Sequence, residues 1–234
     1  MNHGSVARDP ALVREMFDRL SRRYDLANHL LSAGSDVLWR RRSATLLAQR
    51  SPACVLDLAT GTGDLALALS RAMPRAEIVG ADFSEEMLAM ARRKGLSRTV
   101  VADALHLPFA AQSFDAVTIG FGLRNMSDWS AALREMRRVL TSHGHLLVLD
   151  FSLPQGRFLR SAYRFYLHRL LPPLSGFISG QAAAYQYLGA SIEDFPAGEA
   201  MCRLMNENGF ANATAEPLTG GISTIYLAQV QPRP

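Results

Sequence analysis

The sequence is poor in cysteine and has no long apolar run. Its two cysteines, Cys54 and Cys202, are far apart and show no metal-ligand spacing, which excludes a disulfide-rich scaffold and favours a reducing compartment. No stretch approaches the roughly 18 apolar residues of a membrane-spanning helix. The first ten residues also lack the apolar core of a secretory signal. We therefore expect a cytoplasmic protein.

The chain also has little net charge. Its 25 Lys and Arg residues nearly balance 21 Asp and Glu residues, which leaves a formal net charge of +4. The basic residues cluster on expected helices without an evident aromatic-interleaved stripe or an added binding domain, so the pattern typical of nucleic-acid binding is missing. No His, Cys and Asp cluster has ligand spacing. We expect neither a nucleic-acid partner nor a bound metal.

What the sequence does contain is an alternation of strand and helix signals. Five apolar runs in the first two thirds of the chain are expected as strands, at 53–59, 77–81, 98–102, 114–120 and 145–151. Helices are expected to begin at Asp64, Ser84 and Asp128, and a turn is expected at 142–144. Strands that alternate with helices predict a parallel sheet covered by helices on both faces. Two late strands complete the α/β fold, 211–217 and 222–230, of which the last is expected to be antiparallel.

The 234 residues, 48% of them hydrophobic, are enough for one large core. We expect a single domain over residues 1–234. Residues 9–50 are expected to form a helical cap at the N-terminal side, because apolar residues recur there at helical spacing. The alternation stops at 153–199, which we expect to be a helical insertion on the substrate side.

A glycine-rich turn, Asp57-Leu-Ala-Thr-Gly-Thr-Gly-Asp64, follows the first strand. Gly61, Thr62 and Gly63 would let a ligand approach the backbone closely, and the spacing also fits a dinucleotide fingerprint. The flanking acids Asp57 and Asp64 would repel a pyrophosphate, whereas S-adenosylmethionine (SAM) brings a cationic ammonium and sulfonium. We therefore expect SAM as the cofactor, with a NAD-dependent oxidoreductase as the alternative from another class.

Acidic residues also end the next two expected strands. A carboxylate at Asp82 can accept hydrogen bonds from both ribose hydroxyls, and Asp103, followed by Ala104, lies where an adenine would be bound. A helix cap or a surface position is the alternative for each acid. With the first turn, these strand ends predict the nucleoside pocket of a methyltransferase.

The fourth strand leads into the loop Gly120-Phe-Gly-Leu-Arg124-Asn125, which is expected to face the site of methyl transfer. Arg and Asn beside two glycines are unusual for a strand-to-helix connection. The alternative for Arg124 is an ion pair with a carboxylate elsewhere in the chain.

These motifs and several others resemble, in the same order, those of the menaquinone/ubiquinone-biosynthesis C-methyltransferases, a family that includes the demethylmenaquinone methyltransferases. The resemblance runs from about Phe17 to Ile225, and the loop after the fourth strand is far more specific than the glycine turn. The motifs are Tyr24-Asp-x-x-Asn28, Asp57-Leu-Ala-Thr-Gly-Thr-Gly-Asp64, Phe121-Gly-Leu-Arg-Asn125, Arg138-Val-Leu140, Asp150-Phe-Ser152 and Ala184-Tyr-x-Tyr-Leu188-x-x-Ser191-Ile192-x-x-Phe195-Pro196.

The resemblance implies a Rossmann-like, seven-stranded class I SAM-dependent methyltransferase fold and a polyprenyl quinol as the acceptor. It places SAM-binding positions at Thr62, Asp82, Asp103 and Ala104. A further binding position, often Ser in the family, is Gly120 here, so a side-chain contact must be absent there.

The reaction implied is C-methylation of the quinol ring, most directly demethylmenaquinol to menaquinol in menaquinone biosynthesis. Arg124 is too strongly protonated to be a base, so it is expected to stabilise a phenolate or to orient a water. Asn125 is expected to hold the second hydroxyl, and Tyr24 to complete a hydrogen-bond relay. A benzoquinol of the ubiquinone pathway, another lipidic acceptor, an RNA methyltransferase and a non-catalytic SAM-binding protein are the remaining alternatives.

The insertion carries basic residues at helical spacing, namely Arg157, Arg160, Arg164 and His168, between aromatic and aliphatic residues. Such a helix can lie on anionic lipid at the inner face of the cell membrane and admit a prenyl tail. An ordinary lid helix with a solvated basic face is an equal alternative, and the aromatic residues also suit a homodimer contact.

Overall fold

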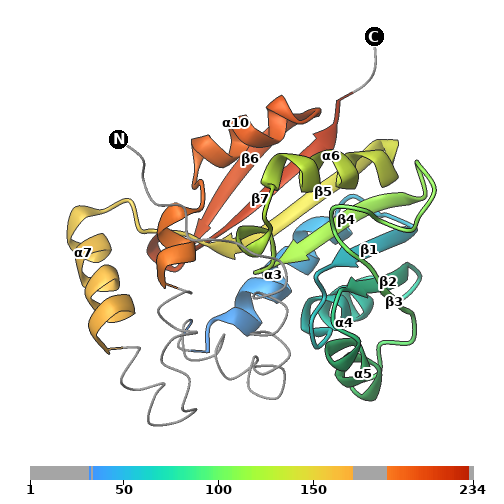
Figure 1. Cartoon of the computed structure of the whole chain (residues 1–234), viewed down its shortest axis with the longest axis horizontal. Coiled ribbons are helices and arrows are strands. Elements are labelled where there is room, and N and C mark those ends of the chain that lie inside the picture. Colours follow the sequence, from blue (N-terminus) through green and yellow to red (C-terminus); the bar gives the residue numbers. More distant parts are fainter. Residues whose placement is uncertain (1–31, 33, 171–188, 232–234) are drawn as a thin grey trace.

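The computed structural model describes residues 32, 34–170 and 189–231. Its centre is one seven-stranded sheet in the order β3-β2-β1-β4-β5-β7-β6 (Figure 1). β1 to β5 pair in parallel, whereas β7 is antiparallel to both β5 and β6. The seven-stranded, mostly parallel sheet is therefore confirmed. The strands are β1 (Cys54–Leu58), β2 (Glu77–Asp82), β3 (Thr99–Val101), β4 (Phe114–Gly120), β5 (Leu140–Phe151), β6 (Phe210–Leu218) and β7 (Ser223–Val230).

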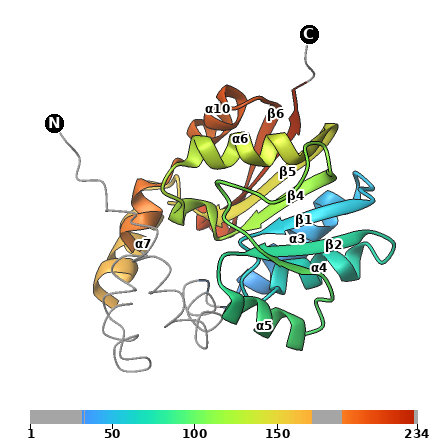
Figure 2. The ribbon, with the colours of Figure 1, turned by 45° about the vertical axis from the view of Figure 1, so that its right-hand side comes forward.

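Helices cover both faces of the sheet, because successive apolar residues of a strand point to opposite sides. On β1, Val55 packs into the core beneath α3, α4 and α5, whereas Leu56 packs into the core beneath α6 and α10. The two views in Figures 1 and 2 show these two helical layers. Their bounds are α3 (Asp36–Ala48), α4 (Asp64–Ala72), α5 (Glu85–Arg93), α6 (Trp129–Val139) and α10 (Glu199–Glu207).

The helix starts expected at Ser84 and Asp128 are confirmed as N-caps. The Ser84 hydroxyl accepts a hydrogen bond from the Met87 backbone N–H at 3.4 Å, and the Asp128 carboxylate accepts one from Ala131 at 2.8 Å. These bonds satisfy N–H groups that the first turn of a helix leaves open. They fix where the chain leaves the carboxyl ends of β2 and β4.

The prediction that a turn at 142–144 separates the helix from the fifth strand is wrong. β5 begins at Leu140, which pairs with Phe114, and the next pair joins Ala116 to His145, so the intervening residues form a bulge. Periodicity alone suggested a break because the bulge interrupts the apolar alternation, although the ladder continues on both sides of it.

The insertion expected at 153–199 is partly helical over its described residues. It contains α7 (Arg157–Phe165), a wider helical turn at Tyr166–Leu170, and a short helical segment at 189–194. Both views place α7 beyond the carboxyl ends of the parallel strands (Figures 1 and 2). The first part of the expected N-terminal cap lies outside the described residues. No helix in the described part of the chain is long and apolar enough to cross a membrane.

Candidate functional site

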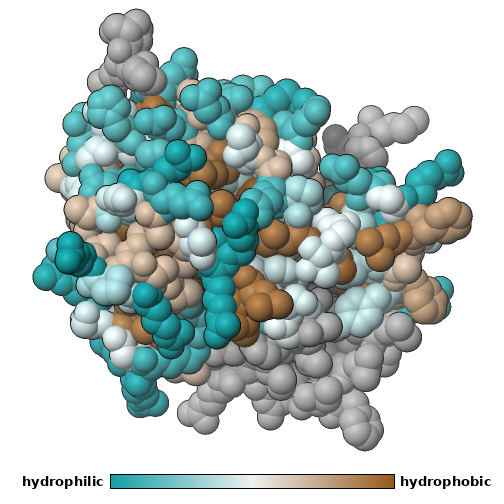
Figure 3. Space-filling model, turned by 180° about the vertical axis from the view of Figure 1, so that it is seen from behind, coloured by the Kyte–Doolittle hydropathy of each residue, from teal (hydrophilic) through white to brown (hydrophobic). Residues whose placement is uncertain are grey.

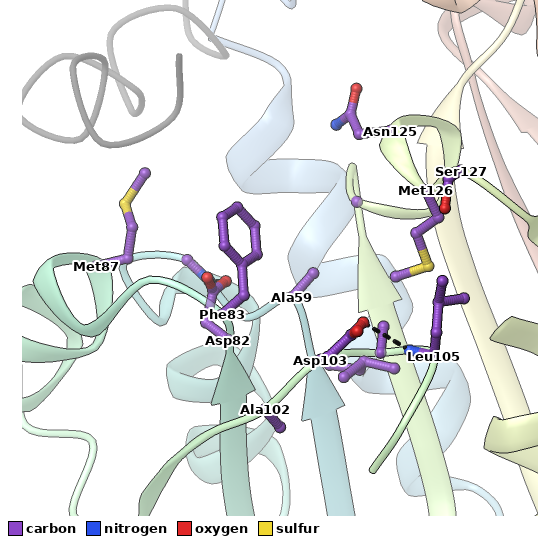
Figure 4. Close-up of a pocket in the computed structure, with 14 residues that line it drawn as sticks. Ala59, Asp82, Phe83, Met87, Ala102, Asp103, Leu105, Asn125, Met126 and Ser127 are labelled. Carbon is purple, nitrogen blue, oxygen red and sulfur yellow. Dashed lines mark hydrogen bonds between the residues drawn. The ribbon is translucent and has the colours of Figure 1, made fainter. Parts of the chain in front are cut away.

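The order of the sheet reverses between β1 and β4, and this switch point is where open α/β sheets bind ligands. A pocket of about 250 Å³ lies there, at the carboxyl ends of the strands (Figure 4). Its walls come from the segments that follow β1, β2, β3 and β4. Four connections that are distant in sequence therefore build one site.

The glycine turn after β1 is tightly wound. Ala59, Gly61 and Gly63 all adopt positive φ angles, of 50°, 55° and 84°. A Cβ on Gly63 would lie 3.0 Å from the Cβ of Ala91 in α5, so glycine is needed there for close packing as well as for its backbone angle. Of the three expected turn residues, Gly61 lines the pocket.

Asp57 lies beneath this turn and not on the pocket wall. Its buried carboxylate accepts hydrogen bonds from the hydroxyls of Thr60 at 2.6 Å and Thr118 at 2.5 Å. Burial raises the pKa of Asp57 to about 6, and the bonds from Thr118 and Thr60 oppose that rise. Asp57 thus connects the glycine turn, through Thr60, to β4, through Thr118.

This raised pKa predicts a pH dependence of stability. A carboxyl whose pKa is raised on folding adds to the free energy of unfolding at low pH. This contribution is full below about pH 3.8 and is lost as the pH rises through about 6. The side chain of the Asp57→Asn variant cannot ionise. Between pH 4 and 6 we therefore expect its free energy of unfolding to fall by roughly 3 kcal/mol less than that of the parent. Urea unfolding across that range measures it, and parallel curves for the two proteins would contradict the assignment.

Asp82 lines the pocket at the end of β2 and joins two of its walls. One carboxylate oxygen accepts from the Gly61 backbone N–H at 2.8 Å, and the other accepts from the Ser84 backbone N–H at 2.9 Å. A carboxylate offers about four acceptor positions, so these two bonds alone do not exhaust it. Asp82 therefore fixes the glycine turn relative to α5 and presents negative charge to the pocket.

Asp103 and Ala104 also line the pocket, just after β3. The Asp103 carboxylate accepts a hydrogen bond from the Leu105 backbone N–H at 2.9 Å, the dashed line in Figure 4. Its side chain is 61% exposed and lies 3.4 Å from the His106 ring nitrogen. The pocket thus has one enclosed acid, Asp82, and one open to solvent, Asp103.

Two other expected cofactor residues support the pocket from outside its wall. The buried Thr62 hydroxyl accepts a hydrogen bond from the Lys94 ammonium at 2.8 Å, and Lys94 also pairs with Asp64. A Cβ on Gly120 would lie 3.1 Å from a methyl group of Leu65, so a larger residue would crowd α4. Neither Thr62 nor Gly120 lines the pocket.

The apolar walls of the pocket were not predicted from the sequence. Phe83, Met87 and Met126 line the pocket beside the acids (Figure 4), but an apolar residue carries no chemical signal of its own. Phe83 directly follows β2, and Met87 and Met126 lie in the segments that follow β2 and β4, which was the available signal. Acids, open backbone and apolar walls together fit a nucleoside with a cationic amino-acid tail.

Arg124 lies in the short helical turn Leu123–Asn125 after β4 and is 1% exposed. Its guanidinium donates to an Asp150 carboxylate oxygen at 2.6 Å and to the Phe121 carbonyl at 2.6 Å, and lies 5.2 Å from the centre of the Phe151 ring. Arg124 does not line the pocket. The ion pair considered from sequence as the alternative is thus present.

Asp150, the partner of Arg124, was not expected as a site residue. It is fully buried at the end of β5 and also accepts from the backbone N–H groups of Arg124 at 3.3 Å and Phe151 at 2.8 Å. Burial raises the pKa of Asp150, and the Arg124 charge opposes that rise. An acid inside an otherwise apolar strand was the signal that could have identified it.

Asn125, next to Arg124, does line the pocket. Its amide nitrogen donates to the Phe121 carbonyl at 3.3 Å, whereas its buried Oδ1 has no hydrogen-bond partner among the described residues. In Figure 4 this amide points away from Asp103. Asn125 is therefore an open acceptor at the edge of the pocket. Tyr24, the third expected catalytic residue, lies outside the described residues.

Comparison with known proteins identifies the family. The model of the ubiE/COQ5 methyltransferase family matches residues 5–229. A demethylmenaquinone methyltransferase of Thermus thermophilus is 50% identical over 217 residues, which cover 91% of this chain and 98% of the relative. The chain belongs to the ubiE/COQ5 methyltransferase family. Family membership confirms the expected SAM-dependent methyltransferase, with SAM as the methyl donor.

A second relative and a solved structure are also similar to this chain. A ubiquinone/menaquinone biosynthesis C-methyltransferase of Syntrophotalea carbinolica is 44% identical and covers 91% of this chain and 92% of its own length. A solved SAM-dependent methyltransferase of Thermotoga maritima, titled a possible histamine N-methyltransferase, has a TM-score of 0.66 at 19% identity and covers 93% of this chain and 99% of its own. The solved structure supports the class I fold alone.

Proposed function

We propose that this chain transfers a methyl group from SAM to a ring carbon of demethylmenaquinol, which yields menaquinol. The observation that carries the proposal is the 50% identity to a demethylmenaquinone methyltransferase over nearly its whole length. The open acceptor of Asn125 beside the pocket supports a substrate with a ring hydroxyl.

The pocket acids are suited to holding the cofactor. Asp82 would accept hydrogen bonds from ribose hydroxyls and Asp103 from an adenine amine, while Ala104 and the apolar walls, which also line the pocket, would contact the base. Asp57, Thr62, Gly63 and Gly120 shape the turn and strand ends behind this surface. SAM supplies a methyl group already activated on a sulfonium, so positioning is the main task that remains.

The acceptor ring must become electron-rich before its carbon can attack. A phenol has a pKa near 10, so anion stabilisation assists the loss of a hydroxyl proton. The Arg124 charge stabilises that oxygen electrostatically from behind the loop, Asn125 accepts from the second hydroxyl, and Tyr24 relays the proton. The ring carbon would take the methyl group as the sulfur–methyl bond breaks and a neutral thioether leaves, and it would then lose its own proton while the oxygen regains one.

Methyl transfer to a defined acceptor tests this function. The parent is incubated with methyl-labelled SAM and chemically reduced demethylmenaquinone, with a demethylated benzoquinol in a parallel arm. We expect the naphthoquinol to be labelled with the higher kcat/KM. A preference for the benzoquinol would move the chain to the ubiquinone step, and no labelling of either quinol would refute the proposal.

We also propose that α7 brings the protein to a membrane surface, where a prenylated acceptor would reside. Phe158 is 94% exposed and Phe165 59% exposed, and Leu159 lies beside them. Figure 3 shows hydrophobic side chains protruding at the edge of the molecule where α7 lies. Two basic residues of α7 are engaged within the protein, because Arg164 pairs with Glu193 and Arg160 donates to a carbonyl. Apolar insertion therefore outweighs charge in this contact.

We expect the Phe158→Ser/Phe165→Ser variant to bind vesicles of mixed neutral and anionic phospholipid roughly tenfold more weakly than the parent. Leu38→Ser removes a similarly exposed apolar residue from α3 and is the matched control. Co-sedimentation measures the binding. Unchanged binding of the double variant would contradict the membrane contact, and a shift from dimer to monomer in size-exclusion chromatography would assign the same face to a homodimer.

A further inference from the structure

Tyr163 is a buried phenol whose hydroxyl has no hydrogen-bond partner among the described residues. It lies on α7, is 5% exposed, and packs in the same core cluster as Phe121 and Phe151. Its ring stacks on Tyr166 with 6.2 Å between centroids. Buried hydroxyls in proteins are nearly always hydrogen-bonded, so an unmade bond here requires an explanation.

The Tyr163 hydroxyl lies in the neighbourhood of Arg124. Arg124 is close enough for its charge to act on the Tyr163 phenol, and Phe151 contacts the Arg124 guanidinium from the same cluster. α7 lies beyond the carboxyl ends of β4 and β5 and away from α5 (Figures 1 and 2). Tyr163 is therefore on the acceptor side of the site and not on the nucleoside side.

The chemistry of the two unsatisfied groups is complementary. Within the described ranges, the Asn125 Oδ1 is an acceptor without a donor and the Tyr163 hydroxyl is a donor without an acceptor. Burial raises the pKa of Tyr163, so its phenol keeps its proton and acts as a donor and not as a base. A quinol ring offers one oxygen that can donate and a second that gains negative charge and can accept.

We propose that Tyr163 is a further acceptor-positioning residue, whose hydroxyl donates a hydrogen bond to one ring oxygen of the quinol while Asn125 accepts from the other. The inference rests on the proposed function, because it requires a ring with two oxygens. The buried hydroxyl is thus kept for the ligand, and its bond is made only in the complex. This role would also explain why α7, a helix of the insertion, carries a buried phenol on the acceptor side of the site.

The Tyr163→Phe variant tests this role. We expect kcat/KM for demethylmenaquinol to fall roughly 10- to 100-fold, because a donor to a partly charged oxygen is lost. The thermal midpoint should stay the same or rise, since the hydroxyl that is removed has no hydrogen-bond partner among the described residues. SAM affinity, measured by calorimetry, should stay within about twofold because Tyr163 does not line the nucleoside pocket.

Tyr226→Phe is the matched control, because its buried hydroxyl does have a partner. It accepts a hydrogen bond from the Gly198 backbone N–H at 2.9 Å, away from the pocket. We expect this variant to lose stability and keep kcat/KM, the reverse of Tyr163→Phe. Two monohydroxy analogues of the quinol, each lacking one oxygen, are also used as competitive inhibitors. Tyr163→Phe should weaken the inhibition by one of them and leave the other unchanged.

The possible outcomes distinguish a failure of the proposed role of Tyr163 from a failure of the proposed function. An active parent whose Tyr163→Phe variant keeps full kcat/KM overturns the role of Tyr163 alone. A variant that loses stability and SAM affinity together makes Tyr163 structural and also overturns it. A parent that methylates no quinol overturns the proposed function, and the inference with it.

Discussion

Replacing Asp150 with alanine is expected to lower the free energy of unfolding by about 3–5 kcal/mol. The reason is that Arg124 would remain buried without its counter-charge, at a position only 1% exposed. For a chain of this size, the loss corresponds to a fall of roughly 6–20 °C in the thermal midpoint. Calorimetry of the parent and variant measures this difference.

The control is a pair of the same charges at the surface. Glu85 and Arg92 form an ion pair with both side chains more than one third exposed, and solvent-exposed pairs contribute about 0–1 kcal/mol. Glu85→Ala should therefore shift the midpoint by only a few degrees. Equal shifts for Asp150→Ala and Glu85→Ala would show that the buried pair contributes no more stability than an exposed one.

A double variant separates stability from catalysis at this pair. Replacing a buried ion pair by apolar residues is often neutral or stabilising, so Arg124→Met/Asp150→Leu should recover most of the stability. If the Arg124 charge stabilises the acceptor oxygen, turnover should nevertheless remain about 100-fold or more below the parent. A stable double variant with parental turnover would reduce Arg124 to a structural role.

Removing the carboxylate of Asp82 is expected to raise the dissociation constant of SAM about 100-fold or more. The Asp82→Ala variant loses the proposed contacts to the ribose together with the two bonds that hold Gly61 and Ser84, and each charge-assisted bond contributes about 1.5–3 kcal/mol. Isothermal titration calorimetry with SAM measures the change.

Glu77→Ala is the control for this variant, because Glu77 begins the same strand at the opposite end and is exposed. Its affinity for SAM should match that of the parent. A change of less than about threefold in Asp82→Ala would place the nucleoside somewhere other than the pocket at the end of β2.

Local patterns predicted most of the fold because each element carried its own signal. The acids at strand ends were identified from sequence, and the parallel sheet then brings Asp82, Asp103 and Ala104 to one pocket. The antiparallel last strand was also expected correctly. The bulge at 141–144 was missed because its register depends on β4, which no local pattern encodes.

Side-chain partners were harder to predict than positions. Arg124 and Asp150 meet because β4 and β5 are neighbours, and the sequence showed each residue without showing that they pair. Thr118 binds Asp57 across the β1–β4 pair for the same reason. The unsatisfied hydroxyl of Tyr163 depends on which residues surround it in the core cluster, which periodicity does not specify.

The position of the transferred methyl group tests the central claim most directly. The parent is given SAM labelled with carbon-13 on the methyl group and reduced demethylmenaquinone, and the product is analysed by NMR, with Asn125→Ala as the site control. We predict a labelled methyl group on a ring carbon and a much lower yield from the variant. Label on a ring oxygen, or equal yields of C-methylated product from both proteins, would contradict the account.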